Sequence, residues 1–139
     1  MRTIAAAILL VLAVVPASAA DIAGKARAID GDTIHIGDRR IRIWGIAAPE
    51  LREAGGREAK AYMAELVALG RVSCIDSHAR SHNRIVAMCS VHGLDLGAEM
   101  VGAGLARDCP AFSGGIYGPI EMIAPRRVAY DLPGYCDRQ

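Results

Sequence analysis

The stretch that decides the fold is DGDTIHIGDRRIRIWGIAAPE, residues 30–50. Apolar and polar residues alternate through residues 34–36 and 40–43, which is the period of two expected of half-buried β-strands. Gly37-Asp38, between the two runs, is typical of a hairpin turn. An antiparallel pair of this kind returns Pro49-Glu50 towards residues 30–32, so the sequence predicts carboxylates and an arginine gathered at one edge of a sheet.

Taken alone, residues 30–33 are a polar turn, because Asp-Gly is a strong turn dipeptide wherever it occurs. Together with several residues further along the chain, they resemble the signature of the thermonuclease (staphylococcal-nuclease-like) family. That signature runs from Asp-Gly-Asp-Thr through a strand carrying an arginine to Asp-x-Pro-Glu. The matching residues here are Asp30-Gly31-Asp32-Thr33, Arg42, Pro49-Glu50, Asn83-Arg84, Val86-Ala87 and Gly104-Leu105-Ala106. The resemblance covers Lys25 to Glu121, and several matches in one order are more specific than any single motif.

Periodicity by itself predicts an α+β fold with an antiparallel sheet. Further strands are expected at residues 72–76 and 84–91, and helices at residues 57–69, 96–105 and 120–124. The resemblance implies a more specific architecture, a five-stranded antiparallel oligonucleotide-binding (OB) type barrel with two to three packed helices. Such barrels present one face and its loops to nucleic acid.

The resemblance also implies a mechanism, metal-assisted hydrolysis of phosphodiester bonds. Glu50 would orient or deprotonate the attacking water. Arg42 and Arg84 would donate hydrogen bonds to the phosphate oxygens as negative charge builds up. Each has a plainer alternative: Glu50 as a solvated loop acid, Arg42 as a cross-strand pairing residue and Arg84 as a surface charge.

The metal implied by the resemblance is calcium, with magnesium or manganese as substitutes. Asp32 would supply a carboxylate ligand and Ala48 a backbone carbonyl, and Asp30 is a further candidate. The chain departs from the family at Ala47, where the family has a second metal-binding aspartate. Because calcium takes six to eight oxygen ligands and carboxylates supply most of the attraction, this departure predicts a weakened site.

A second departure lies in RSHNR, residues 80–84, where the family usually has Asp-Arg-Tyr-Gly-Arg. Asn83 can adopt the left-handed backbone conformation that glycine adopts, so Arg84 can still be aimed correctly. His82 replaces a tyrosine that contacts the nucleotide. The four histidines share no spacing, which favours ordinary surface or half-buried side chains over a transition-metal site.

Residues 1–20 have the features of a cleavable secretory signal, with Arg2 before the apolar run 4–15 and small residues at 16–20. The run is well short of the ~20 residues that span a bilayer. We expect a domain of residues 21–139 that is periplasmic or secreted, monomeric, and not stably inserted in a membrane. Without Arg2 the basic residues equal the 15 acidic ones, so the overall charge gives no indication of nucleic-acid binding.

Four cysteines remain after the signal, an even number that predicts two disulfides in an exported chain. Three pairings are open. The pairing of Cys74 with Cys89 is favoured, because they lie in two predicted neighbouring strands, and Cys109 with Cys136 would then tie the tail back. A zinc site is the rival, but no Cys-x-x-Cys occurs.

Two functions remain. The first is an exported nuclease that cuts DNA or RNA with the help of a divalent metal. The alternative is a catalytically inactive OB-type barrel that binds nucleic acid or protein.

Overall fold

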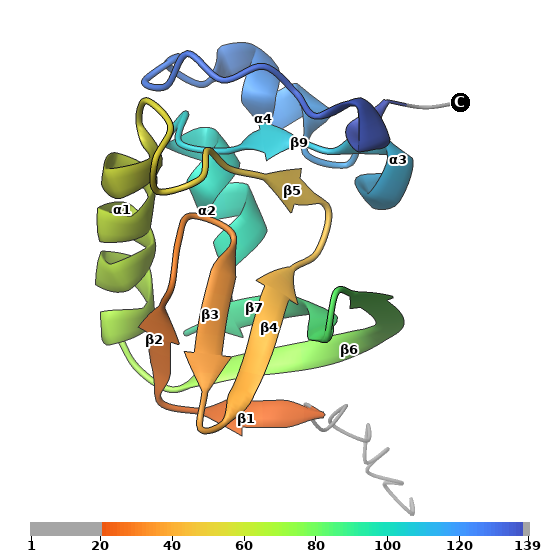
Figure 1. The fold of residues 1–139 in the computed structure, drawn as a ribbon. Coiled ribbons are helices and arrows are strands. Elements are labelled where there is room, and N and C mark those ends of the chain that lie inside the picture. Colours follow the sequence, from red (N-terminus) through yellow and green to blue (C-terminus); the bar gives the residue numbers. More distant parts are fainter. Residues whose placement is uncertain (1–20, 138–139) are drawn as a thin grey trace, which may run out of the picture.

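The structure is a computed structural model that describes residues 21–137. A curved sheet forms one half of the molecule, helix α1 flanks it, and the other helices and the C-terminal segment gather at one end (Figure 1). The expected signal, residues 1–20, lies outside the described residues. Within residues 21–137, no helix has both the length and the apolar character to cross a membrane.

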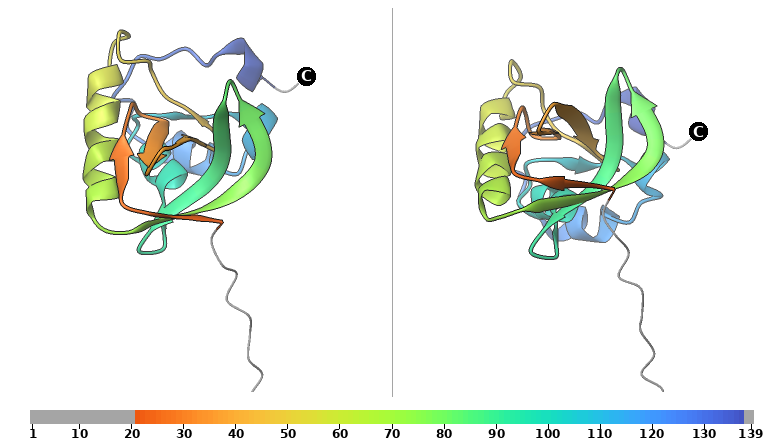
Figure 2. Two further views of the ribbon diagram at one scale, coloured as in Figure 1. Left: turned by 60° about the horizontal axis from the view of Figure 1, so that its bottom comes forward. Right: turned by 90° about the horizontal axis from the view of Figure 1, so that it is seen from below.

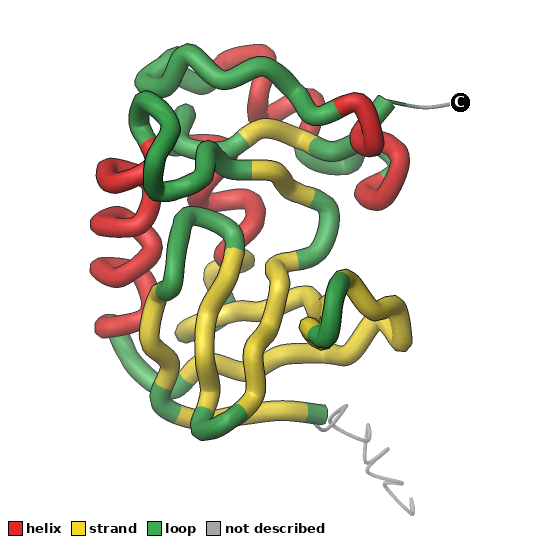
Figure 3. Tube along the Cα trace, in the orientation of Figure 1, coloured by secondary structure: helices red, strands yellow, loops and turns green. Residues whose placement is uncertain are grey.

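The strands are β1 Ile22–Gly24, β2 Ala26–Ala28, β3 Thr33–Ile36, β4 Arg39–Ile43, β5 Ile46–Ala47, β6 Val72–Ser81, β7 Arg84–Val91, β8 Leu94–Asp95 and β9 Arg107–Asp108. The helices are α1 Gly56–Ala68, α2 Leu96–Gly102, α3 Pro110–Ser113 and α4 Gly118–Ile123, with a 3-10 turn, η1, at Gly134–Cys136. Figure 3 shows most strands gathered in one half of the molecule with α1 alongside, whereas the short strands β5 and β9 lie among the loops and helices of the other half. The α+β class is confirmed, and residues 21–137 contain four helices rather than two to three, of which α2, α3 and α4 are short.

The sheet has the order β1-β6-β7-β4-β3-β2. Its two ends, β1 and β2, are consecutive pieces of one strand that is interrupted only at Lys25. The strand ladder therefore begins and ends on the same stretch of chain, and the sheet curls round on itself (Figure 2). This is the OB-type barrel arrangement that the sequence predicts, with one pairing that differs: β4 and β7 run parallel.

The hairpin of β3 and β4 shows how the alternating sequence builds the wall of the barrel. Ile34 and Ile41 are register partners, and both are fully buried in the core. Their neighbours in each strand point the other way, so Thr33 lies opposite Arg42 on the other face of the sheet. Helix α1 packs against β2 and α2, and Ala59, Met63, Leu66 and Val67 are buried there.

Two disulfides tie the chain together. Cys74 on β6 is bonded to Cys89, its register partner on β7. Cys109, just before α3, is bonded to Cys136 in η1. These are the two pairings that the sequence favours. The second bond holds the C-terminal segment, which crosses the end of the molecule above β5 and β9 and ends beside α3 (Figure 1).

Candidate active site

The loop between β2 and β3 positions the first site residue, Asp32. The Asp30 carboxylate accepts a hydrogen bond from the backbone N–H of Asp32 at 3.0 Å, which closes a tight Asx turn. A Cβ on Gly31 would lie 2.7 Å from the Cβ atoms of both Ala48 and Ala59. Only glycine therefore lets this loop pack against α1 and the segment after β5.

The Asp32 carboxylate is enclosed by hydrogen-bond donors. Its Oδ2 accepts from the backbone N–H of Ala48 at 3.0 Å and lies 3.3 Å from Nη1 of Arg42. Its Oδ1 accepts from the Thr33 hydroxyl at 3.1 Å. Burial raises the pKa of Asp32 to about 6, with Arg42 opposing the rise and Asp30 adding to it. At pH 7 the carboxylate is therefore mostly ionised and pairs with Arg42.

Arg42 is held by several groups at once. Its side chain is only 11 % exposed, and it also donates to the carbonyl of Ile43 at 3.3 Å. Burial alone would lower the pKa of Arg42, but the Asp32 carboxylate and, to a smaller extent, Tyr135 outweigh it and raise the pKa. The guanidinium is thus permanently charged and fixed in place.

Arg84 reaches the same network from the other side. Its Nη1 donates to the Thr33 hydroxyl at 3.3 Å, and its Nη2 donates to the Ser81 hydroxyl at 3.1 Å. Because β4 and β7 pair in parallel, Ile41 lies beside Ile85 and Arg42 beside Val86, which places Arg42 and Arg84 on one face of the sheet. Thr33 and Asp32 connect the two guanidinium groups.

The turn before Arg84 has the backbone conformation that lets the Arg84 side chain lie in this position. His82 and Asn83 have φ angles of 50° and 34°, the left-handed pair typical of a two-residue hairpin turn. Asn83 therefore adopts the conformation expected of it from the sequence. His82 is exposed at the tip of this hairpin.

Glu50 lies at the end of a tightly folded loop. Its backbone N–H donates to the Glu53 carboxylate at 2.7 Å, and a Cβ on Gly56 would lie only 1.9 Å from its carbonyl oxygen. Its side chain is exposed, and within residues 21–137 its carboxylate has no hydrogen-bond or ion-pair partner. The structure thus joins Asp32, Arg42 and Arg84 in one network and leaves the Glu50 carboxylate outside it, two residues after Ala48.

A calcium site cannot be built from these residues alone. The described part of the chain contains no group of three or more histidine, cysteine or acidic side chains that could hold a metal ion. Asp32 contributes one carboxylate, and both its oxygens already accept hydrogen bonds. The described side chains therefore supply far fewer than the six to eight oxygens that calcium takes, which agrees with a weakened site.

Ala47, at the position where the family has its second metal-binding aspartate, is part of the packed interior of this fold. It lies in β5, paired with Arg107 of β9, and is fully buried. It packs in a small apolar cluster with Cys109 and Cys136. The position where the family has an aspartate is therefore lined by a disulfide in this chain.

The part of the sequence that matches a known family contains both arginines of the network and Glu50, whereas Asp32 and Thr33 lie before it. A family model described as staphylococcal nuclease homologue matches residues 40–113, slightly more than half of the chain. The chain belongs to this family. The match spans Arg42, Glu50 and Arg84 and ends before the C-terminal segment of this nuclease homologue. A search among curated proteins found no match.

Two residues of the network were predicted from the sequence only in part or not at all. Thr33 was recognised only as part of a motif, yet it is fully buried and bridges Arg84 to Asp32. Tyr135 was not predicted, although it reaches Arg42 from the C-terminal segment. The available signal was its neighbour Cys136, since a bond to Cys109 places Tyr135 next to α3.

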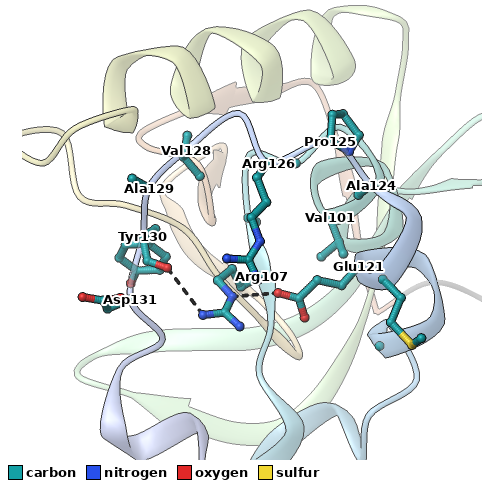
Figure 4. A pocket seen from close by; sticks show the side chains of 14 residues that line it. Val101, Arg107, Glu121, Ala124, Pro125, Arg126, Val128, Ala129, Tyr130 and Asp131 are labelled. Carbon is teal, nitrogen blue, oxygen red and sulfur yellow. Dashed lines mark hydrogen bonds and ion pairs between the residues drawn. The ribbon is translucent and has the colours of Figure 1, made fainter.

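A pocket of about 770 Å³ lies between α2, α4 and the C-terminal segment (Figure 4). Its main charged pair is already satisfied: Arg107 donates to Glu121 at 2.7 Å and to the carbonyl of Tyr130 at 3.5 Å. The Tyr130 ring is half-buried, and burial raises its pKa, with smaller contributions from charged groups that include Asp32. The pocket therefore adjoins the network through Tyr130, and two of the four charged side chains that line it, Arg107 and Glu121, pair with each other.

Proposed function

We propose that this staphylococcal nuclease homologue hydrolyses phosphodiester bonds within DNA or RNA chains. The observation that supports it most is the continuous network from Arg84 through Thr33 and Asp32 to Arg42. It fixes two guanidinium groups on one face of an OB-type barrel. Guanidinium groups are well suited to phosphate, because their planar donors match its oxygens.

The proposed roles are based on the environment of each side chain. Arg84 is half-buried, and hydroxyls are its only side-chain partners among the described residues, so a phosphate oxygen can replace them at small cost. Arg42 is paired with Asp32 and supplies fixed positive charge next to the phosphate. Such preorganised charge stabilises the transition state, because it needs no rearrangement as negative charge develops.

Glu50 is the proposed general base. It accepts a proton from water while the water oxygen bonds to phosphorus, and the bond to the leaving sugar oxygen breaks. The leaving oxygen takes up a proton from solvent. An exposed carboxylate that lies outside the hydrogen-bond network is free to accept this proton, and general bases of this kind typically contribute 10²–10⁴-fold.

The divalent cation remains a prediction from the family. Calcium, or magnesium or manganese in its place, would find Asp32, the Ala48 carbonyl and Asp30 as protein ligands. Because Asp32 is already engaged by donors, we expect weak binding and a dependence on millimolar rather than micromolar cation.

We further propose that the protein acts outside the cytosol, in the periplasm or as a secreted monomer. The two disulfides are compatible with an oxidising compartment. The amino-terminal signal expected from the sequence would direct export, and the domain would be residues 21–139.

The test is cleavage of closed circular single-stranded DNA and of RNA by the disulfide-intact protein, with each of the three cations and with a chelator. We expect internal cuts that Glu50→Gln abolishes and that Glu65→Gln, an exposed acid on α1, leaves unchanged. No cleavage under any condition, together with retained nucleic-acid binding, would establish the inactive binding domain instead. Equal cleavage rates for Glu50→Gln and Glu65→Gln would show that Glu50 is not the general base.

A further inference from the structure

Three strands of the barrel, β2, β3 and β4, carry a row of basic side chains on their outer face. Arg27 is the register partner of His35, and His35 is the register partner of Arg40. Ile34 and Ile41, which are adjacent to His35 and Arg40 along the strands, are fully buried in the core. Because successive side chains of a strand point to opposite faces of the sheet, the three basic side chains point away from the core.

This basic row is open to solvent and unpaired. Arg27 and Arg40 are exposed and His35 is half-buried, and no helix or loop crosses in front of the three strands (Figure 1). Within residues 21–137, none of the three side chains has a hydrogen-bond or ion-pair partner. No residue of β2, β3 or β4 is acidic. The turn between β3 and β4 contributes one exposed acid, Asp38, which forms no ion pair with the row.

The basic row leads directly into the arginine network. Arg40 lies two residues before Arg42 in β4, so their side chains point to the same face, about 7 Å apart along the strand. Arg40 and Arg84 immediately precede Ile41 and Ile85, which are register partners in the parallel pair of β4 and β7. The row and the two guanidinium groups of the network therefore share one face of the barrel.

We propose that Arg27 and Arg40, with His35 between them, bind the phosphates that flank the reacting phosphate in a single strand of DNA or RNA. The proposal rests on the proposed function, since it takes Arg42 and Arg84 as the site of the reacting phosphate. Proteins that bind single strands without sequence preference use a positively charged surface that follows the backbone. The step of about 7 Å from one basic side chain to the next along β4 is comparable with the separation of consecutive phosphates. The substrate is then a chain of several nucleotides, whereas a dinucleotide does not reach the row.

A face that is merely solvated makes a different prediction. In that case, replacing an arginine of the row affects binding only through the loss of charge, which any other exposed arginine would cause equally. Direct contact predicts a loss of affinity that is specific to the row. It also predicts a smaller dependence of affinity on salt, because each phosphate contact releases counterions.

The experiment measures binding of single-stranded DNA and RNA of about twelve nucleotides, within the site sizes of OB folds, over a range of salt concentrations in chelator. We expect Arg27→Gln and Arg40→Gln each to weaken binding about fivefold. Each should reduce the slope of the logarithm of affinity against the logarithm of salt concentration by about 0.7, and the two together by about 1.4. DNA and RNA should respond alike, because both contain the phosphates that are contacted.

The control is Arg126→Gln, which removes the same charge from the C-terminal segment. Arg126 is exposed and has no partner within residues 21–137, so its replacement should change affinity less than twofold and leave the salt slope unchanged. Because the substituted side chains lie outside the core, all melting temperatures should stay close to that of wild type. With a divalent cation, the row variants should raise KM for the long strand and leave kcat unchanged. The ratio of kcat/KM for the long strand to kcat/KM for a dinucleotide should fall about fivefold.

The outcomes separate the two proposals. An affinity and a salt slope of Arg27→Gln and Arg40→Gln equal to those of Arg126→Gln would overturn the role of the row and leave the proposed function standing. Binding that depends on the row, without cleavage in any cation, would support the row as a binding surface and overturn the proposed hydrolysis. Absence of binding to any strand by the wild-type protein, in chelator and with calcium, would overturn both.

Discussion

Arg84 and Thr33, 51 residues apart in the chain, are joined by a hydrogen bond of 3.3 Å from the guanidinium Nη1 to the hydroxyl oxygen. The same hydroxyl donates to Asp32, which pairs with Arg42. One buried threonine thus connects β3 to β7 and links both guanidinium groups. The two arginines that would contact the phosphate lie on strands β4 and β7 of the barrel rather than on free loops, which favours precise positioning.

The first prediction concerns this bridge. Thr33→Val keeps the shape of the fully buried side chain but removes the hydroxyl, leaving Arg84 and Asp32 each without one partner. We expect a loss of about 1–3 kcal/mol in the free energy of unfolding. Cleavage should fall about tenfold, because Arg84 is no longer held. Urea denaturation and single-turnover cleavage measure the two effects.

Thr33→Ser is the matched control, because it keeps the hydroxyl and loses only a methyl group. Its cleavage rate should stay within about threefold of wild type. Equal activity in Thr33→Val and wild type would show that the bridge does not position Arg84.

The second prediction separates function from stability at Arg84 and Glu50. Neither side chain is in the core, so Arg84→Ala and Glu50→Ser should leave the melting temperature nearly unchanged. Each should lower kcat by about 10²-fold or more, the cost typical of losing one preorganised donor or a general base. Arg39→Ala, at the exposed start of β4, serves as the control for Arg84. Wild-type rates in both variants would mean that the hydrolytic chemistry lies elsewhere.

The predicted secondary structure is most accurate where the apolar residues repeat most regularly. The helix expected at residues 57–69 is α1 at Gly56–Ala68, because four buried residues repeat at helical spacing. The helix expected to reach Leu105 ends instead at Gly102. Gly104 there has a φ of 72°, a left-handed conformation that ends the helix.

Two features of the sheet could not be predicted from the spacing of apolar residues. Strand β6 continues five residues beyond the expected Asp76, and those residues are mainly exposed, so no apolar alternation marks them. Nothing local in the sequence indicates that β4 pairs in parallel with β7, although this pairing brings Arg42 and Arg84 together.

The site was predicted as separate parts rather than as a network. Motif order located Asp32 as a metal ligand and Arg42 as a phosphate ligand, and the structure shows that they pair with each other. Burial explains the difference: a carboxylate and a guanidinium removed from water side by side are stable only as a pair. Tyr135 depends on a disulfide that closes 27 residues of chain, which no local pattern reveals.

The third prediction concerns the bond between β6 and β7. Replacing Cys74 and Cys89 together with serine opens a loop with a sequence separation of 15 residues. We expect a loss of about 3 kcal/mol from the entropy of the unfolded chain, and a further loss because both side chains are buried. Thermal unfolding with and without reductant measures it. A reductant that lowers the melting temperature of the double variant as much as that of wild type would assign the effect to Cys109–Cys136 instead.

The last prediction concerns the missing carboxylate at Ala47. Ala47→Asp would place a carboxylate in the fully buried cluster beside Cys109 and Cys136. Without metal, burying a charge among apolar groups is costly, so the variant should unfold at a clearly lower temperature than wild type in chelator. A cation bound between the new carboxylate and Asp32 would offset this, because a ligand that binds only the folded state stabilises it. Calcium should therefore raise the melting temperature of Ala47→Asp by several degrees more than that of wild type. The substitution should also increase calcium-dependent cleavage.

Ala47→Asn is the control for this prediction. It has nearly the same size as aspartate and no charge, so calcium should not raise its melting temperature more than that of wild type. Equal calcium responses in the aspartate and asparagine variants would show that position 47 does not face a cation site in this protein.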